Sequence, residues 1–286
     1  MKPVLQEKKL HHRLWIIYLF IFIICIVGIG MAVYMQYYQE ENMGAIFGVT
    51  DEESENQDEY NELVSEFSSI FTNEIDILQT ETIEVEKIND EYDIIVTAYT
   101  YQVEEENYTL DVSIPYINIK DDITIAYNAE TKEEFKSRAE EIISEGSSEE
   151  IVYNVRYRAY IQNNIISLII EAEIKEGSKS QKISIKTYNY NFVEQKEVSL
   201  EELLEIKGVS LDDASNKIIE EIEEVQNQND ALAEQGYVLY QRDITSDMYE
   251  IENTENYFLG QDGMIYVIYA YGNTDYTSEM DIIIFQ

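Results

Sequence analysis

Residues 151–174 read IVYNVRYRAYIQNNIISLIIEAEI and contain two β-strand patterns separated by a short turn. Both patterns, at 151–161 and 165–174, are rich in the β-branched and aromatic residues that strands favour. Asn163 and Asn164 lie between them, and asparagine tolerates the left-handed backbone angles of a tight turn. A third strand is expected at 183–192, after the connection KEGSKSQK at 175–182.

Upstream of these strands, the sequence predicts a helix and a β-hairpin. The alternation of apolar and polar residues at 108–116 predicts a strand with one buried face, and EEEN at 104–107 is expected to join it to a strand within 92–103. From Tyr60 onward, apolar residues recur at three- and four-residue steps, as on one side of a helix. This stripe is either a partner-binding face or a face that packs on its own domain; its members are Leu63, Phe67, Ile70, Phe71 and Leu78.

Three further helices and a second group of strands complete the predicted order. Thr131 with Glu134 and Ser199 with Glu202 have the spacing of capping boxes, and a longer helix is expected after Ser210. Residues 256–285 predict three strands, with Asp262 and Gly263 forming a hairpin turn. This order of elements indicates the α+β class, with mostly antiparallel sheets and packed helices.

Before the folded region, residues 14–35 form an apolar run without charge. A helix of about 22 residues is about 33 Å long and can cross a bilayer. Basic residues precede the run, which favours a cytoplasmic N-terminus and an external C-terminal part. A secretory signal peptide is the alternative, but its apolar segment is only about 7–15 residues. The sequence therefore predicts a single-pass cell-membrane protein that contacts lipid through 14–35.

The predicted organisation has five segments. They are a cytoplasmic arm at 1–13, the transmembrane helix at 14–35, an acidic stalk at 36–59, a small α+β domain at 60–150 and a second α+β domain at 151–286.

The chain is strongly acidic, with 58 Asp and Glu against 19 Lys and Arg and a formal net charge of −39. Four of the basic side chains and only one acidic side chain (Glu7) precede the apolar run, so the external part is more acidic still. Such a field repels nucleic acid and attracts cationic proteins or peptides. A plainer interpretation is that the acidic side chains keep an exposed domain soluble.

The chemistry of the external part is restricted because both histidines (His11 and His12) and the single cysteine (Cys25) lie at or before the apolar run. This excludes Ser-His-Asp and Cys-His catalysis and zinc sites with histidine or thiolate ligands there. A cell-wall enzyme that uses paired carboxylates is the catalytic alternative, and no carboxylate spacing identifies a calcium site. We therefore expect a non-catalytic binding protein without a cofactor or a resident metal.

One polar, tyrosine-containing stretch near the C-terminus is a candidate contact surface for a partner. It reads YAYGNTDYTSE at 269–279 and is expected to be a loop. The candidate contact residues are Tyr269, Tyr271, Asp275, Tyr276 and Glu279.

Several phrases resemble a known bacterial family. NIISLIIEAEI (164–174), TYNYNFVEQKEVSLEELLE (187–205) and NYFLGQDGMIYVIYAYG (256–272) are similar to the extracytoplasmic domain of RsiV, a membrane-spanning anti-sigma factor that senses lysozyme. SIPYINI (113–119) and Asn128 are similar to the small domain that precedes it there and in a polysaccharide deacetylase of the PdaC type. The resemblance implies an envelope protein that recognises lysozyme or another cationic protein.

The sequence departs from this family in two places. EGSKSQK (176–182) replaces the Gly-Gly-Ala-His-like turn of the relatives, and the arm at 1–13 is too short to fold around a sigma factor. The sensing part is therefore expected without the anti-sigma output, and an anti-sigma-type signal transducer is the alternative. No deacetylase domain is present, so that activity is not expected.

Overall fold

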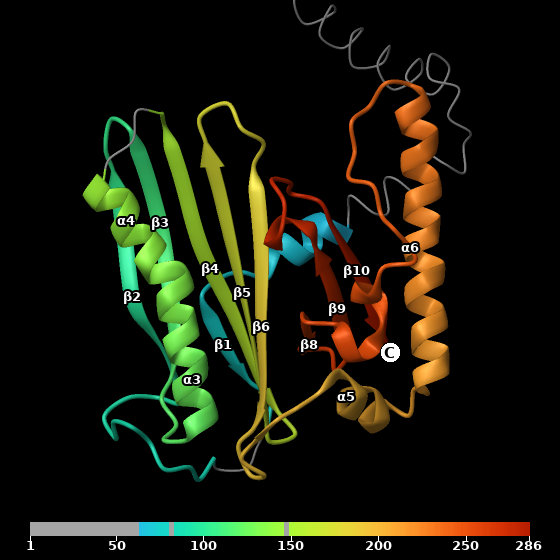
Figure 1. Ribbon diagram of the computed structural model, residues 1–286. Coiled ribbons are helices and arrows are strands. Elements are labelled where there is room, and N and C mark those ends of the chain that lie inside the picture. Colours follow the sequence, from blue (N-terminus) through green and yellow to red (C-terminus); the bar gives the residue numbers. More distant parts are fainter. Residues whose placement is uncertain (1–62, 80–82, 146–148) are drawn as a thin grey trace, which may run out of the picture. The chain divides into compact units, whose positions relative to one another are not determined.

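The computed structural model describes residues 63–79, 83–145 and 149–286 (Figure 1). The chain from Asn61 to Gln286 forms one compact unit. None of the helices in the described ranges has both the length and the hydrophobicity that a membrane crossing needs. The predicted arm at 1–13, transmembrane helix at 14–35 and stalk at 36–59 all lie outside the described residues.

The fold is α+β, and its larger sheet has seven strands in the order β2-β3-β4-β5-β6-β7, with β1 paired to β4. Most neighbouring strands are antiparallel, as predicted. The strands are β1 (Glu74–Ile77), β2 (Ile95–Glu104), β3 (Tyr108–Ile117), β4 (Ile151–Gln162), β5 (Ile165–Glu176), β6 (Lys182–Asn191) and β7 (Lys196–Glu197).

The centre of this sheet is the hairpin of β4 and β5, in agreement with the strand patterns at 151–161 and 165–174. Gln162 pairs with Ile165, so only Asn163 and Asn164 form the turn. Their φ angles are 52° and 63°, the left-handed region that a two-residue hairpin of type I′ requires. The long pairing between β4 and β5 therefore follows directly from the local sequence.

Two parallel pairings connect the segments that the sequence divided into separate domains. β3 and β1 both run parallel to β4, so the sheet is mixed. The predicted boundary between 60–150 and 151–286 coincides with the start of β4 at Ile151. Both segments thus contribute strands to one sheet, and the boundary lies inside it.

Helices cover one face of the large sheet. They are α3 (Asp122–Thr131), a π-helical turn (Lys132–Lys136) and α4 (Ser137–Glu145), which follow one another along the sheet (Figure 1). Their core includes Phe135 together with Ile166 and Leu168 of β5. The opposite side of β5, which carries Ile165 and Ile169, belongs to other core clusters, as the two-residue period of a strand requires.

The second face of the large sheet carries a three-stranded antiparallel sheet in the order β10-β9-β8. Its strands are β8 (Tyr257–Leu259), β9 (Ile265–Ala270) and β10 (Met280–Phe285), as predicted from 256–285. α5 (Leu200–Lys207) and α6 (Leu211–Glu234) pack against this sheet (Figure 1). The capping box of Ser199 and Glu202 is present, and Ser210 caps α6.

Two helix predictions are wrong. Thr131 does not begin a helix, because the helix starts ten residues earlier, where Asp121 accepts a hydrogen bond from the N–H of Ile123. Thr131 has helical backbone angles and makes no capping bond. The helix that starts the described region covers only 63–69, so Leu78 is not part of its stripe but follows β1.

Candidate functional site

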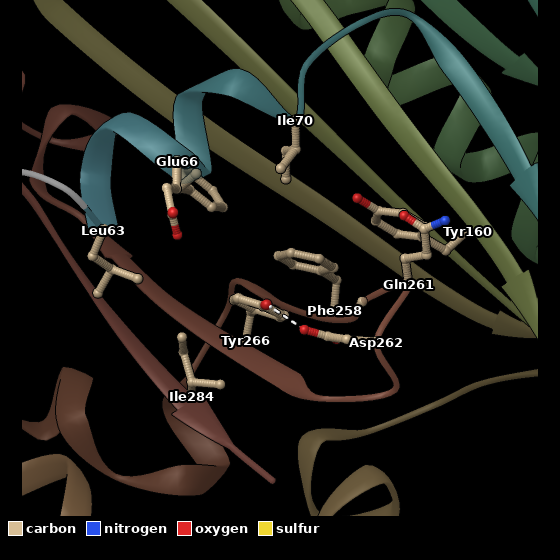
Figure 2. A pocket seen from close by; sticks show the side chains of 11 residues that line it. Leu63, Glu66, Ile70, Tyr160, Phe258, Gln261, Asp262, Tyr266 and Ile284 are labelled. Atoms are coloured by element: carbon tan, nitrogen blue, oxygen red, sulfur yellow. Dashed lines mark hydrogen bonds between the residues drawn. The ribbon is translucent and has the colours of Figure 1, made fainter.

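A cavity of about 460 Å³ opens between the first helix (63–69) and the small sheet (Figure 2). Five separate parts of the chain contribute to it: this helix and the residue after it, β4, β8 with the turn that follows, β9 and β10. The lining residues are Leu63, Glu66, Phe67, Ile70, Tyr160, Phe258, Gly260, Gln261, Asp262, Tyr266 and Ile284.

The floor of the cavity is aromatic. Phe258 is buried at its centre, and its ring is stacked against Tyr266 at 4.8 Å and against Tyr160 at 5.9 Å between centroids. Phe67 approaches Phe258 from the helix, with centroids 6.4 Å apart. Half-buried aliphatic side chains such as Ile70 complete the wall. Because these rings stack on one another and all but Tyr266 are buried, the floor offers mainly apolar contact, with Tyr266 as its half-buried aromatic member.

The mouth of the cavity is acidic. Asp262 is exposed, and its Oδ2 accepts a hydrogen bond from the Tyr266 hydroxyl at 2.7 Å. Its Oδ1 accepts from the N–H of Met264 at 2.9 Å, so this carboxylate is held in position. Figure 2 shows the carboxylate of Glu66 directed from the helix toward the cavity. Within the described part of the chain, no Lys or Arg lines the cavity, so the described lining presents two carboxylates without a basic residue beside them.

The electrostatics of Tyr266 reflect this arrangement. Burial raises the pKa of its hydroxyl, and the hydrogen bond to Asp262 and the nearby negative charges raise it further. Tyr266 therefore stays neutral and continues to donate to Asp262 at physiological pH. Among the described residues, the lining contains no histidine or cysteine, and it offers carboxylate acceptors beside an apolar surface.

The turn that carries Asp262 depends on glycine. A Cβ on Gly260 would lie 2.6 Å from Cε2 of Tyr266, too close for the ring to keep its place. Gly263 has a φ of 76°, which supports the predicted Asp-Gly turn. The backbone N–H of Gly260 also donates to the carbonyl of Met264 at 2.8 Å. The local sequence thus holds the acidic turn next to the aromatic floor.

Two of the five predicted contact residues are inside the protein. Tyr269 and Tyr271 are 4% and 1% exposed, and both belong to the lining of a second cavity of this small sheet rather than to an open loop surface. The Tyr271 hydroxyl donates to Asp281, and the Tyr249 hydroxyl lies 2.9 Å from that of Tyr271. Asp281 is also in an ion pair with the buried Arg242, whose Nε is 2.6 Å from its Oδ2. Both tyrosines belong to the hydrophobic cluster that includes residues of α5, α6 and β10, and the polar network of Tyr271 with Asp281 anchors the start of the loop.

The other three predicted residues lie beyond this buried start. Asp275 and Tyr276 are exposed, and the Tyr276 ring lies under the Lys179 ammonium group at 5.0 Å. Glu279 is half-buried, and its Oε1 accepts a hydrogen bond from the N–H of Tyr240 at 2.7 Å. None of the five lines the cavity of Figure 2. A contact role for Asp275, Tyr276 and Glu279 stays a prediction.

The residues of this cavity were not predicted as a site. Of the stripe that is either a partner-binding or a packing face, Phe67 is buried, and Leu63 and Ile70 are half-buried in the cavity wall; the partner-binding alternative stays a prediction. The only other local signal was the Asp-Gly turn. Within the described ranges, no group of three His, Cys, Asp or Glu side chains is arranged to hold a metal ion.

Comparison with known proteins gives matches among solved structures only. No protein-family profile matches the sequence, and no curated protein matches it. A crystal structure of a DUF3298 family protein from Pseudomonas aeruginosa PAO1 is similar, with 11% identity and a TM-score of 0.37, over 71% of this chain and 90% of that one. A DUF3298 member from Bacteroides fragilis NCTC 9343 has 14% identity and a TM-score of 0.31, over 62% of this chain and 80% of that one.

Proposed function

We propose that this protein is a non-catalytic binding module, held at the outside of a bacterial cell by residues 14–35, that recognises a cationic protein such as lysozyme. The observation that carries the proposal is the cavity of Figure 2, which combines an aromatic floor with the carboxylates of Glu66 and Asp262 and has no basic lining residue.

A basic side chain of the partner fits this combination. Its aliphatic stem would lie on the half-buried Tyr266 and Ile70, and its charged end would reach Glu66 and Asp262. A cation over an aromatic ring contributes about 0.5–2 kcal/mol, depending on how well it is desolvated. Arginine side chains inserted in such pockets are typical hot spots of protein interfaces.

The distribution of charge outside the cavity favours the same kind of partner. In the described part of the chain, ten Lys and Arg side chains already form ion pairs with carboxylates. Few basic side chains therefore remain to balance the other carboxylates on the surface. α6, for example, presents Asp212, Glu220 and Glu223 to solvent. Such a field accelerates association with a cationic protein and makes the rate sensitive to salt.

The binding experiment uses the full-length chain in detergent and lysozyme as the cationic probe. Affinity is measured by calorimetry at low and at physiological salt, and we expect it to fall as salt rises. Glu66→Gln removes one charge at the cavity and is expected to weaken binding about three- to tenfold. Glu133→Gln is the matched control, because Glu133 is equally exposed but belongs to the helical layer on the other face of the large sheet.

The outcomes separate the two parts of the proposal. No binding of lysozyme at low salt would contradict recognition of this cationic protein. Equal weakening by Glu66→Gln and Glu133→Gln would show that only the overall field acts and that the cavity is not the contact site.

Display outside the cell has its own test. A C-terminal epitope tag on the full-length chain, expressed in a bacterium, is expected to be removed by protease added to intact cells. A tag that survives until the cells are lysed would place the C-terminal part inside and contradict the proposed topology.

A further inference from the structure

A second cavity, of about 540 Å³, lies on another side of the small sheet. It is formed by two short 3-10 helices, η2 (Asp247–Tyr249) and η3 (Ile251–Asn253), by the residues that lead into β8, and by the end of β9 with the turn after it. It shares no lining residue with the cavity of Figure 2.

Asn256 is the unusual member of this lining. It is only 7% exposed, and its backbone carbonyl accepts a hydrogen bond from the N–H of Ile268 at 2.9 Å, which extends the pairing of β8 with β9. Its side-chain amide, in contrast, has no hydrogen-bond partner among the described residues. The amide atoms do not belong to the fully buried polar atoms that lack a hydrogen bond, so they stay accessible at the cavity, where they can both accept and donate a hydrogen bond.

The other lining groups add acceptors and a small apolar surface. Asp247, Glu252 and Glu255 are exposed carboxylates around the cavity. Its apolar and aromatic members are Met248, Ile268, Tyr269, Ala270 and Tyr271. Among the described residues, no Lys or Arg lines it. The carboxylates do not form a cluster that could hold a metal ion, within the residues that the structure describes. The ligand must therefore supply several donors that are spread in space.

Hydrogen bonds hold the walls of the cavity in place. Asn253 Nδ2 donates to the carbonyl of Asp247 at 3.0 Å and so ties η3 to η2. On the opposite side, Asn273 accepts from the N–H of Ile185 at 2.9 Å and donates to its carbonyl at 3.0 Å, which fixes the turn after β9 to β6. The cavity is thus formed before any ligand arrives, as is usual for small-molecule sites.

We propose that this cavity binds a neutral saccharide unit. Each sugar hydroxyl is both a donor and an acceptor, so neighbouring hydroxyls can satisfy both ends of the Asn256 amide and also donate to Glu252 or Glu255. Ammonium and guanidinium groups only donate and would leave the Asn256 NH₂ without an acceptor. The volume lies in the range of about 300–1,000 Å³ that is typical of ligand pockets.

Saturation-transfer NMR on the full-length chain tests this proposal with maltotriose, cellotriose and the trimer of N-acetylglucosamine as probes. We expect transfer to the ring protons of at least one probe. Asn256→Ala and the isosteric Asn256→Asp are each expected to lower its affinity about three- to tenfold, the effect of one lost hydrogen bond. Asn216→Ala, at an exposed position on α6, is the control and should leave the affinity unchanged.

Thermal melting of each variant shows whether it remains folded. The proposal is overturned if no probe receives transfer, or if folded Asn256→Ala and Asn256→Asp both bind as the wild type does. Transfer to a trilysine peptide that folded Asn256→Ala abolishes and Glu66→Gln does not, when no saccharide receives transfer, would identify a cationic peptide as the ligand of this cavity instead.

Discussion

Glu171 gives a prediction that can be worked out from the structure in detail. It lies on β5, is 1% exposed and accepts a hydrogen bond from Arg156 Nη2 on its Oε1 at 2.8 Å. Its Oε2 makes no hydrogen bond in the described part of the chain. Burial, and secondarily the nearby charge of Glu173, raise the pKa of Glu171 to about 7, against the opposing effect of Arg156.

The direction of the stability effect follows from proton binding. Between the usual pKa of 4.5 and the raised value of about 7, the folded protein holds a proton at Glu171 that the unfolded chain has released. Protonation in this range therefore favours the folded state, and the free energy of unfolding falls as pH rises through the window. At about 1.36 kcal/mol per pKa unit, the loss is on the order of 3 kcal/mol and is complete above pH 7.

Glu171→Gln isolates this contribution, because the amide keeps the shape of the side chain and cannot ionise. Unfolding by urea, followed by circular dichroism, would compare the variant with the wild type from pH 4 to pH 8. We expect similar free energies of unfolding at pH 4 and a variant that is more stable by about 3 kcal/mol at pH 8. The comparison cancels the general repulsion among the many other carboxylates.

A second substitution tests the cause of the shift. Glu173→Gln removes the like charge beside Glu171, so it should lower the pKa of Glu171 and reduce the pH dependence of stability, whereas Glu133→Gln on the exposed helical layer should change nothing. A constant difference between Glu171→Gln and the wild type at all pH values would refute the reasoning, because it would mean that Glu171 ionises equally easily in both states.

Three further substitutions test other parts of the fold. Asp281→Asn leaves the buried Arg242 without its closest counter-charge, so the free energy of unfolding should fall by about 3–5 kcal/mol in urea; a loss below 1 kcal/mol would show that Glu279 can replace Asp281. Gly272→Ala places a Cβ about 1.8 Å from the carbonyl oxygen of Ile183, so it should lower the melting temperature, and a neutral result would mean that the turn after β9 moves freely from β6. Ser199→Ala removes the capping box of α5 and should lower the free energy of unfolding by about 1 kcal/mol in the same urea assay. Ser278→Ala, at an exposed loop position, is the control and should leave it unchanged.

The antiparallel strands could be predicted because their signals are local. The paired asparagines at 163–164 and the apolar patterns on either side define the hairpin of β4 and β5 without reference to the rest of the chain. The parallel pairing of β4 with β3 and β1 has no such signal, because it joins residues such as Leu110 and Tyr153 that a helical layer separates in sequence. For that reason the predicted domain boundary fell inside one sheet.

The start of the helical layer was missed for a different reason. α3 has polar residues at its buried positions, Thr124 and Thr131, so it lacks the apolar stripe by which a helix is recognised. Thr124 Oγ1 donates to the carbonyl of Ile119 at 2.7 Å, and Thr131 Oγ1 donates to the Tyr188 hydroxyl at 3.2 Å. The hydroxyl groups of these threonines are thus hydrogen-bonded inside the fold. In the sequence, Thr131 followed by Glu134 has the spacing of a capping box, so the pattern predicts a helix start at the wrong place.

The acidic composition can be read from the sequence, whereas the cavity exists only in the folded protein. Charge is additive along the chain, so the preference for a cationic partner can be argued from composition alone. The cavity cannot be derived from composition, because Glu66 and Asp262 are far apart in sequence and come to line one cavity only when β8 and β9 pack near the helix at 63–69. In the proposed complex, overall charge would govern how fast and how salt-sensitively the partner associates, whereas the cavity would govern how tightly one side chain is held. If both operate, salt should act mainly on the association rate and Glu66→Gln mainly on the dissociation rate, and stopped-flow measurements with lysozyme can separate the two.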